Sequence, residues 1–217
     1  GLVHGESGYR FGVPLQEPPR RVVSLVPGLT ESLFDLALGD RLIGVSNDCL
    51  YPAARLAALP RLGRAAAPDV ERIVALHPDF VLLDRDITNP EATEGLRSAG
   101  IHGWVVHPCT VQQAINLLWE IMEVFEEPAM VERVRWIERQ MDWTVNATRV
   151  RRPVRVFAPI ARDPWLTCAP GTYGCDLLRV CGGESIGGAG ESGAACVPVT
   201  LDAVIRQQPE VILDIVV

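Results

Sequence analysis

The sequence predicts an α/β protein of two lobes with mainly parallel sheets, joined by one long backbone helix. Short apolar runs alternate with segments of helical spacing on short connections, as is typical of parallel sheets covered by helices. One stretch near the middle, Ala129–Arg149, has the length and spacing of a single helix. Two segments on either side of it, Asp69–Leu83 and Thr200–Asp214, resemble each other without gaps.

The first part of the chain, residues 1–128, carries the elements of one lobe. Residues 1–19 are polar and rich in proline and glycine, which predicts an arm or a short edge hairpin. Apolar, β-branched runs predict strands over Arg21–Val26, Leu42–Val45, Phe80–Asp84 and Trp104–His107. Capping and periodicity predict helices that begin after Thr30 and after Asp69, and helices over Pro90–Ala99 and Val111–Phe125.

The linking helix is predicted over residues 129–150. Its apolar residues recur on one face at Met130, Val134, Ile137, Met141 and Val145. Pro128 stands where a first-turn proline is tolerated, and Pro153 prevents continuation at the other end. At about 1.5 Å per residue the helix is roughly 30 Å long, about the width of a small domain.

The second lobe is predicted over residues 151–217. Val154–Ala158 is its first strand, and a long loop follows over residues 159–174. A helix over Cys175–Cys181 then leads into a glycine-rich loop, Gly182–Gly193. Thr200 caps the last helix, and Val211–Val217 is the last strand.

The two matching segments indicate a repeated α/β unit, one on each side of the linking helix. The cap residues Asp69 and Thr200 align, and so do the acids Glu71 and Asp202 two positions later. In parallel α/β sheets, ligands bind beside the carboxyl ends of the strands. Two lobes that face each other across a rigid helix are therefore expected to hold a ligand in a cleft formed by these loops.

Composition excludes several classes of function. The chain has 217 residues, 48% of them apolar, so it can form a real core. A formal net charge of −7 argues against nucleic acid or an anionic membrane as a partner. No phosphate-binding loop, nucleophile elbow or catalytic triad is recognisable, so the sequence predicts no enzyme.

Four motifs in order resemble one known family. RVVSLVPGLTE, GDRLIGVS, DVERIVALHPDFVL and LLRVCGGESI are similar to segments of the class III, helical-backbone substrate-binding proteins of ABC importers. The likeness runs from about Arg20 to the last residue and is greatest to the cobalamin-binding branch, beside the ferric-siderophore binders. It implies a non-catalytic periplasmic binding protein, a helical-backbone metal receptor, that delivers a corrinoid (cobalamin-like) ligand or an iron-siderophore-like metal chelate to a permease.

The resemblance also implies site residues. In that family an acid on each lobe docks on the transmembrane ABC permease dimer, and the matching positions here are Glu71 and Asp202. Where the vitamin B12 receptor presents aromatic rings to the corrin, this chain has Asp48, Ala65 and Cys196. Residues that could replace those rings or supply polar contacts are Tyr51, Trp165, Tyr173, Arg162 and Asp163.

Cysteines and one histidine leave further possibilities open. Cys49, Cys168 and Cys196 fall on predicted cleft loops, where they could bind a soft metal, although no zinc-type spacing supports this. A disulfide of Cys168 with Cys196 or with Cys175 is an alternative, and buried thiols are the default. His107 leaves a strand toward the predicted cleft and is the best histidine candidate for an axial or metal ligand.

Two other functions remain open at this stage: an intracellular corrinoid or metal carrier, and a chelatase-like enzyme that acts on a tetrapyrrole. We expect a monomer with no covalent cofactor and no resident metal, in an extracytoplasmic compartment, periplasmic or lipid-anchored. Residues 1–19 show no secretion signal, so a mature or trimmed chain and a cytoplasmic protein both fit. Because Val211–Val217 ends the chain in a strand, we expect further C-terminal residues or a partner over that sheet edge.

Overall fold

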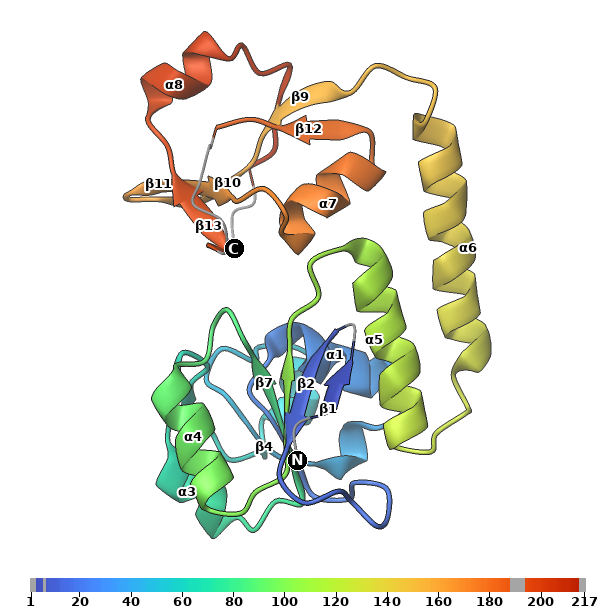
Figure 1. Ribbon diagram of the computed structural model, residues 1–217, viewed down its shortest axis with the longest axis vertical. Coiled ribbons are helices and arrows are strands. Elements are labelled where there is room, and N and C mark those ends of the chain that lie inside the picture. The colour runs from blue at the N-terminus through green and yellow to red at the C-terminus, as the bar shows by residue number, and fades with distance from the viewer. Residues whose placement is uncertain (1–2, 6, 188–193, 215–217) are drawn as a thin grey trace. The chain divides into compact units, whose positions relative to one another are not determined.

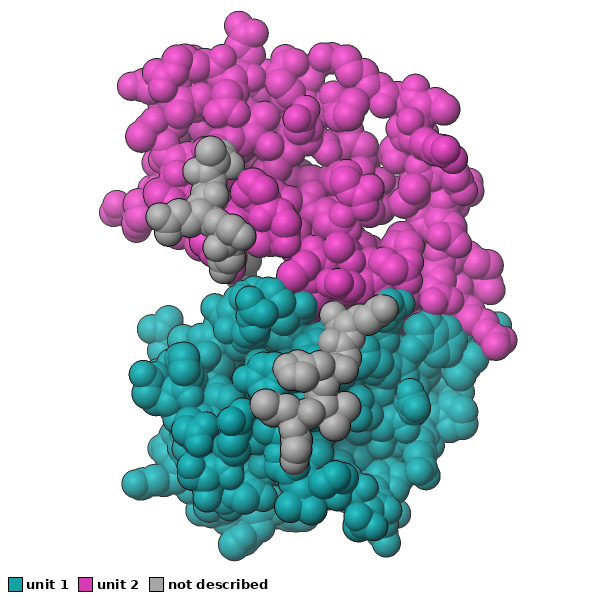
Figure 2. All heavy atoms as spheres, in the orientation of Figure 1, with its two compact units in different colours: residues 1–107, 116–133 teal, residues 108–115, 134–217 magenta. Residues whose placement is uncertain are grey.

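The computed structural model describes residues 3–5, 7–187 and 194–214 of the chain. These residues form two compact units, each described by itself below (Figure 2). Unit 1 comprises Gly1–His107 and Asn116–Arg133, and unit 2 comprises Pro108–Ile115 and Val134–Val217. The α/β class is confirmed. The division at residues 128 and 150 and the linking role of the long helix stay predictions.

Unit 1 is built on a six-stranded sheet in the order β1-β2-β8-β7-β3-β4. The four strands β8, β7, β3 and β4 are parallel, and β2 and β1 continue the sheet as an antiparallel hairpin. The predicted N-terminal hairpin and all four predicted strands are confirmed. Their bounds are Val3–Gly5 (β1), Gly8–Phe11 (β2), Val22–Ser24 (β3), Leu42–Val45 (β4), Phe80–Asp84 (β7) and Gly103–Val106 (β8).

Helices and short elements connect these strands or, in the case of α5, follow the last of them. The helices are α1 (Pro27–Asp35), α2 (Ala53–Leu56), α3 (Val70–Ala75), α4 (Pro90–Ser98) and α5 (Val111–Val124), with a 3-10 turn η1 (Gly39–Arg41). A small ladder joins β5 (Gly63–Arg64) to β6 (Ala67–Pro68). Figure 1 shows α3 and α4 together on one face of the sheet.

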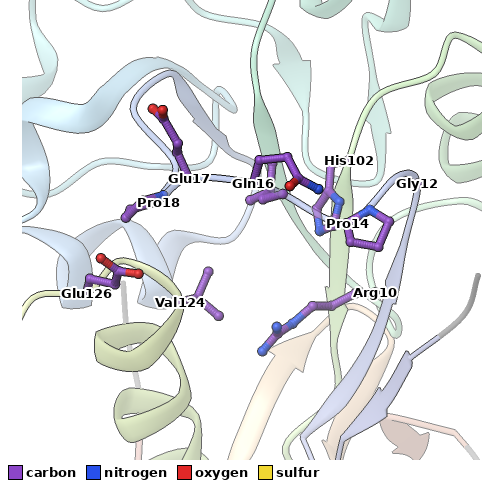
Figure 3. A pocket seen from close by; sticks show the side chains of 10 residues that line it. Arg10, Gly12, Pro14, Gln16, Glu17, Pro18, His102, Val124 and Glu126 are labelled. Atoms are coloured by element: carbon purple, nitrogen blue, oxygen red, sulfur yellow. The ribbon is translucent and has the colours of Figure 1, made fainter.

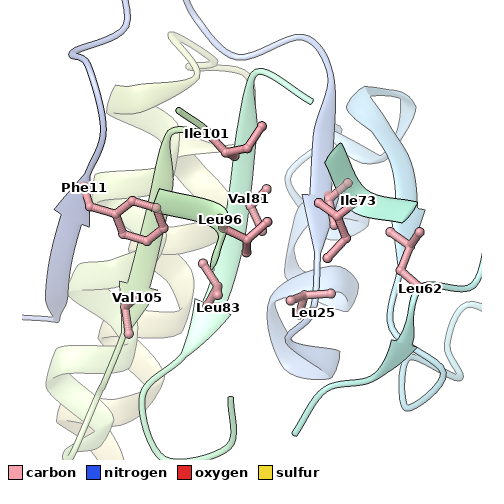
Figure 4. Packing of buried hydrophobic residues seen from close by; sticks show 10 residues of the cluster. Phe11, Leu25, Leu62, Ile73, Val81, Leu83, Leu96, Ile101 and Val105 are labelled. Carbon is pink, nitrogen blue, oxygen red and sulfur yellow. The ribbon is translucent and has the colours of Figure 1, made fainter. Parts of the chain in front are cut away.

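The core of unit 1 forms because alternate strand residues point to the same face. Val23, Val81 and Val105 turn toward α3 and α4 and pack with Ile73 and Leu96 from those helices (Figure 4). On the opposite face, the ring of Phe80 meets Phe125, just beyond α5, edge-on at 6.0 Å between centroids. Both faces of the parallel strands are therefore covered, as parallel sheets require.

Local capping explains where the helices begin. The side chain of Asp69 accepts from the backbone N–H of Arg72 at 3.0 Å, as predicted for α3. The prediction that Thr30 caps its helix was wrong, because α1 already begins at Pro27, whose fixed φ suits a first helical turn. Thr30 is buried inside α1 and donates to the carbonyl of Val26 or the hydroxyl of Ser24.

Unit 2 contains two three-stranded sheets. The parallel sheet has the order β12-β9-β14 and the antiparallel sheet the order β10-β11-β13. The strands are β9 (Val154–Phe157), β10 (Pro159–Arg162), β11 (Trp165–Cys168), β12 (Gly183–Ser185), β13 (Cys196–Pro198) and β14 (Val211–Ile212). The helices are α6 (Val131–Thr148), α7 (Tyr173–Val180) and α8 (Leu201–Arg206), the last capped by Thr200 as predicted.

Two predicted loops of unit 2 contain strands in the structure. The long loop over residues 159–174 was wrong, because β10 and β11 form a hairpin there, and its buried Thr167 hydroxyl donates to the carbonyl of Ala158 at 3.0 Å. The predicted glycine-rich loop Gly182–Gly193 was wrong at its start, because Gly183–Ser185 forms strand β12, which pairs with β9. Residues 188–193 of this loop lie outside the described residues. The same holds for residues 215–217 of the predicted last strand.

In unit 1 an arginine next to β3 and an acid just before β7 bond to each other's backbone, and the arginine also bonds to the turn after α3. We call this arrangement the clamp. His77, directly after α3, adopts a left-handed φ of 49°. The Nε of Arg21, next to β3, donates to the carbonyl of His77 at 3.1 Å. The carboxylate of Asp79 accepts the backbone N–H of Arg21 at 3.0 Å, and the N–H of Asp79 returns a bond to the carbonyl of Arg21.

Unit 2 contains the same clamp at the matching positions. Gln208, after α8, also has a φ of 49°. The Nε of Arg155 donates to the carbonyl of Gln208 at 2.9 Å, and Glu210 accepts the backbone N–H of Arg155 at 3.0 Å. The backbone N–H of Arg155 and the neighbouring arginines hold the pKa of Glu210 below its ordinary value. The aligned segments therefore share a hydrogen-bonding pattern as well as a sequence pattern.

We predict that Asp79→Ala lowers the free energy of unfolding by about 1–3 kcal/mol, because it leaves backbone donors of Arg20 and Arg21 without their charged acceptor. Urea denaturation followed by circular dichroism measures the change, with Glu31→Ala on the exposed side of α1 as the matched control. Equal unfolding midpoints for the two variants would show that the clamp contributes nothing to stability.

Candidate functional site

The carboxyl ends of β7 and β8 bring two acids and a histidine together in unit 1. Asp84 is the last residue of β7, Asp86 lies in the turn that follows, and His107 directly follows β8. The Nδ1 atom of His107 lies 3.1 Å from a carboxylate oxygen of Asp86. The His107 backbone N–H donates to the carbonyl of Ser7 at 2.7 Å, so the hairpin side of the sheet also fixes this residue.

The electrostatics of this cluster come from partial burial. Burial raises the pKa of Asp84. The backbone N–H of Asp86, which donates to the Asp84 carboxylate at 2.8 Å, acts in the opposite direction and lowers it. A carboxylate that accepts a hydrogen bond from Nδ1 fixes the tautomer of an imidazole and leaves Nε2 as the basic nitrogen. Metal-binding histidines commonly have a carboxylate in this position. The sequence indicated His107 as a candidate ligand but no partner for it. A signal for this partner was available, because two neighbouring parallel strands end in Asp84 and Val106, which brings the residues that follow them close together.

The loop after β4 holds three of the predicted ligand residues. The carboxylate of Asp48 accepts the backbone N–H of Ala65 at 2.6 Å, so these two predicted residues do meet. The side chain of Ala65 is only 2% exposed, and Asp48 is engaged in holding the loop. Tyr51 is 62% exposed and is the aromatic side chain that this loop presents to solvent.

Cys49, by contrast, points into unit 1. It is 1% exposed, and its sulfur lies 3.2 Å from the Thr30 hydroxyl and 3.3 Å from the Ser46 hydroxyl. The prediction that Cys49 faces a cleft was wrong, because the loop turns this side chain under α1. Its role in the described structure is that of a packed thiol in a buried polar network.

In unit 2, the β10–β11 hairpin carries Asp163 and Trp165. Asp163 is exposed at the turn, whereas Trp165 lies on β11 and packs against Phe157 at 6.2 Å between ring centroids. The guanidinium of Arg162 lies 5.9 Å from the Trp165 ring and pairs with Asp214. Trp165 therefore forms part of the small core of unit 2 and one wall of an apolar cavity of about 370 Å³.

Tyr173 and Cys196 lie on other elements of unit 2. Tyr173 is the first residue of α7 and is 41% exposed. Cys196 begins β13, where it stands opposite Cys168 of β11. A cavity of about 530 Å³ lies beside the first turn of α7 and is lined by Cys109, Thr172, Cys175, Asp176, Arg179 and Glu184, among others.

The two predicted docking acids occupy equivalent exposed positions. Glu71 lies in the first turn of α3, two residues after the cap Asp69, and Asp202 lies in the first turn of α8, two residues after the cap Thr200. Within the described ranges, neither takes part in an ion pair of the unit that carries it. An acid in a first turn also stabilises the helix through its dipole, so both roles are compatible.

A separate cavity of about 270 Å³ lies under the N-terminal arm of unit 1 (Figure 3). His102 lines it, stacks on Phe80 at 5.2 Å between ring centroids, and has its Nδ1 2.6 Å from the carbonyl of Val13. Burial lowers the pKa of His102 below its ordinary value of 6.5, and Arg10 acts in the same direction. The residue is therefore a structural histidine that anchors the arm.

Two features are not found among the described residues. No helix among them is both long and apolar enough to cross a membrane. Nor do they contain a group of three or more His, Cys, Asp or Glu side chains arranged to hold a metal ion.

The sheet topology and the clamp describe an α/β protein with a repeated unit, and comparison with known proteins gives the family. Residues 22–213 match the family model described as periplasmic binding protein. Because this match spans most of the chain, the chain belongs to that family.

The individual relatives share about a quarter of the aligned residues with this chain. The vitamin B12-binding protein of Vibrio parahaemolyticus is 27% identical over 197 residues, which cover 90% of this chain and 70% of the relative. Among solved structures, the periplasmic vitamin B12-binding protein BtuF of Vibrio cholerae matches with a TM-score of 0.79 and 25% identity, over 91% of this chain and 76% of that one. The periplasmic heme-binding protein RhuT of Roseiflexus matches with a TM-score of 0.72 and 26% identity, over 90% and 76%.

We predict that the free energy of unfolding falls as the pH drops below about 6.5, and that His102→Asn reduces this loss. The folded state disfavours the charged imidazole, so the pKa of His102 is lower in the folded than in the unfolded state. Between these two pKa values the unfolded state binds more protons at this residue. The stability contributed by neutral His102 is therefore present above the unfolded pKa and is lost as the pH falls toward the folded pKa. Urea denaturation between about pH 7 and pH 5 measures the slope. The same slope in the variant and the parent chain would contradict this assignment.

Proposed function

We propose that this chain is the substrate-binding protein of an ABC importer and that its ligand is a corrinoid or a related metal chelate. The observation that carries the proposal is the family match over residues 22–213, together with relatives named for binding vitamin B12 and heme. Both named ligands are flat macrocycles with a central metal. The protein acts by binding and handing over such a ligand, in an extracytoplasmic compartment.

Within unit 1, the proposed ligand surface is the carboxyl end of the parallel sheet. Tyr51 presents an exposed ring there, and His107 with Asp86 supplies an imidazole set by a carboxylate. Asp48 and Ala65 shape the same end of the sheet by bonding to each other. An aromatic ring gives a macrocycle an apolar surface, and an imidazole gives its metal an axial nitrogen.

Within unit 2, the proposed contributions come from the exposed residues of the hairpin and of α7. Asp163 at the hairpin turn suits the amide or hydroxyl groups of a decorated macrocycle, because a carboxylate accepts hydrogen bonds from both. Tyr173 offers an aromatic face at the start of α7. Trp165 on β11 and Cys196 at the start of β13 are the other two ligand residues predicted for this unit.

The pair His107–Asp86 favours a second candidate ligand, heme, over cobalamin. A histidine oriented by a carboxylate is a strong axial donor for heme iron. The positions implied for aromatic contacts with a corrin hold Asp48, Ala65 and Cys196, which offer no rings. A direct titration with each macrocycle can therefore distinguish between the two ligands.

We predict saturable binding, at micromolar concentration or tighter, to at least one of cobalamin, cobinamide, heme and a ferric siderophore. Titration of the whole chain, followed by tryptophan quenching and by the visible spectrum of the ligand, measures it. If heme is the ligand, His107→Ala shifts its visible bands toward those of free heme, whereas His77→Asn, at an exposed histidine in the turn after α3, leaves them in place. Flat titrations with all four ligands at high micromolar concentration would refute the proposed function.

The permease contact is proposed at Glu71 and Asp202. Each exposed ion pair contributes only about 0–1 kcal/mol, so the two acids act mainly on orientation and encounter rate. Their equivalent positions in the repeat place one acid on each unit, in the first turn of a short helix. This is the arrangement that two matching basic pockets on a dimeric permease would recognise.

We predict that Glu71→Lys with Asp202→Lys abolishes uptake but leaves ligand affinity unchanged, because reversed charges repel a basic pocket without touching the ligand residues. Uptake of the titrated ligand is measured in membrane vesicles that contain the permease. Glu91→Lys is the matched control, since Glu91 also stands in the first turn of a helix, α4, two residues after its cap. Uptake at the parental rate by the double variant would exclude this docking role.

A further inference from the structure

Two cysteines of unit 2 lie within contact distance of each other. Cys168 is the last residue of β11, and Cys175 stands in the first turn of α7. Their sulfur atoms are 2.9 Å apart. Cys168 is buried and Cys175 is half-buried, and the Cys175 sulfur also lies 3.4 Å from the carbonyl oxygen of Cys168.

The connection between the two residues holds them in this position. The Thr172 hydroxyl donates to the carbonyl of Ala169 at 2.6 Å, which closes the turn before α7. Gly171 has a φ of +79°, a conformation that favours glycine. A Cβ at Gly174 would stand 3.2 Å from the Cβ of Cys168, so the absence of a side chain there lets the helix approach the strand closely.

The structure also distinguishes between the two possible partners of Cys168. Cys196 stands opposite Cys168 across the β11–β13 pair, so the strand register alone would allow either bond. The sulfur contact at 2.9 Å, however, is made with Cys175. A disulfide requires a sulfur separation of about 2.04 Å, so the two sulfur atoms, now 2.9 Å apart, have to approach each other by about 0.9 Å.

We propose that Cys168 and Cys175 are an oxidisable dithiol that closes to a disulfide and ties the first turn of α7 to the end of β11. The oxidant is a disulfide, either a small one such as oxidised glutathione or that of a thiol oxidoreductase. Two S–H bonds break and one S–S bond forms in the protein, and the two electrons and two protons reduce the oxidant to two thiols.

The positions of the two residues give the order of the exchange. Cys175 lines the cavity beside α7, so its sulfur is the one that an incoming disulfide can reach. Burial raises the pKa of the Cys175 thiol to about 11, and the neighbouring Cys168 adds to this rise, so the first attack is slow at neutral pH. The buried Cys168 then displaces the mixed disulfide. This inference does not depend on the identity of the ligand.

Trypsin offers a direct test on the whole chain without any substitution. Cleavage after Arg162 and Arg179 releases Asp163–Arg179, which contains both cysteines and no other. Cys196 falls in the next peptide, which runs from 180 to 206. After incubation with oxidised glutathione and alkylation by N-ethylmaleimide, we expect Asp163–Arg179 to carry no alkyl group and to be lighter by two hydrogens.

Two results would overturn the proposal: alkylation of both cysteines in Asp163–Arg179 after oxidation, or a cross-link between that peptide and the peptide 180–206. Thermal unfolding adds a second readout. The oxidised chain should unfold several degrees higher than the reduced chain, because the bond restricts the unfolded state. Cys175→Ser should remove this difference and Cys196→Ser should keep it, whereas loss of the difference only in Cys196→Ser would also overturn the assignment.

Discussion

An arginine that reaches back to a left-handed turn holds each unit of this protein together. A helix that stops with a residue of positive φ leaves backbone carbonyls without partners, and the guanidinium supplies the missing donors. Arg21 does this for His77, and Arg155 does it for Gln208. An acid two residues after the turn then accepts the arginine's own backbone N–H. In both units the acid directly precedes the next parallel strand, so the clamp ties the beginning of that strand to the arginine.

The chemistry of unit 1 follows from the parallel arrangement of its strands. Neighbouring parallel strands end at the same edge, so side chains that are distant in the sequence meet there. The pairing of His107 with Asp86 is the clearest example, since the residues follow two adjacent strands. Burial at the same edge raises the pKa of Asp84.

Residue type alone was a poor guide to which side chains face solvent. Cys49 follows a strand, yet the loop folds it under α1 among hydroxyl groups. Trp165 lies in a segment without an obvious strand pattern, yet β11 places it in the core of unit 2. Cys168 is buried too, but a short glycine-containing turn brings Cys175 to it. In each case a contact with another element decides the environment of the side chain.

The sequence by itself determined the α/β class, the six strands of the unit 1 sheet, nearly all of the helices and the repeat, because these depend on local periodicity, caps and turn residues. The resemblance of four motifs indicated the family. The short strands β5, β6, β10, β11, β12 and β13 were not predicted. Asp69 and Thr200 show this well, since a cap bonds only to its own helix. Only the tertiary structure decided the hairpin at 159–168, the partner of His107 and the partner of Cys168. Those depend on which strands lie side by side and on how closely a helix approaches a sheet, and neither property is encoded in a short stretch of residues.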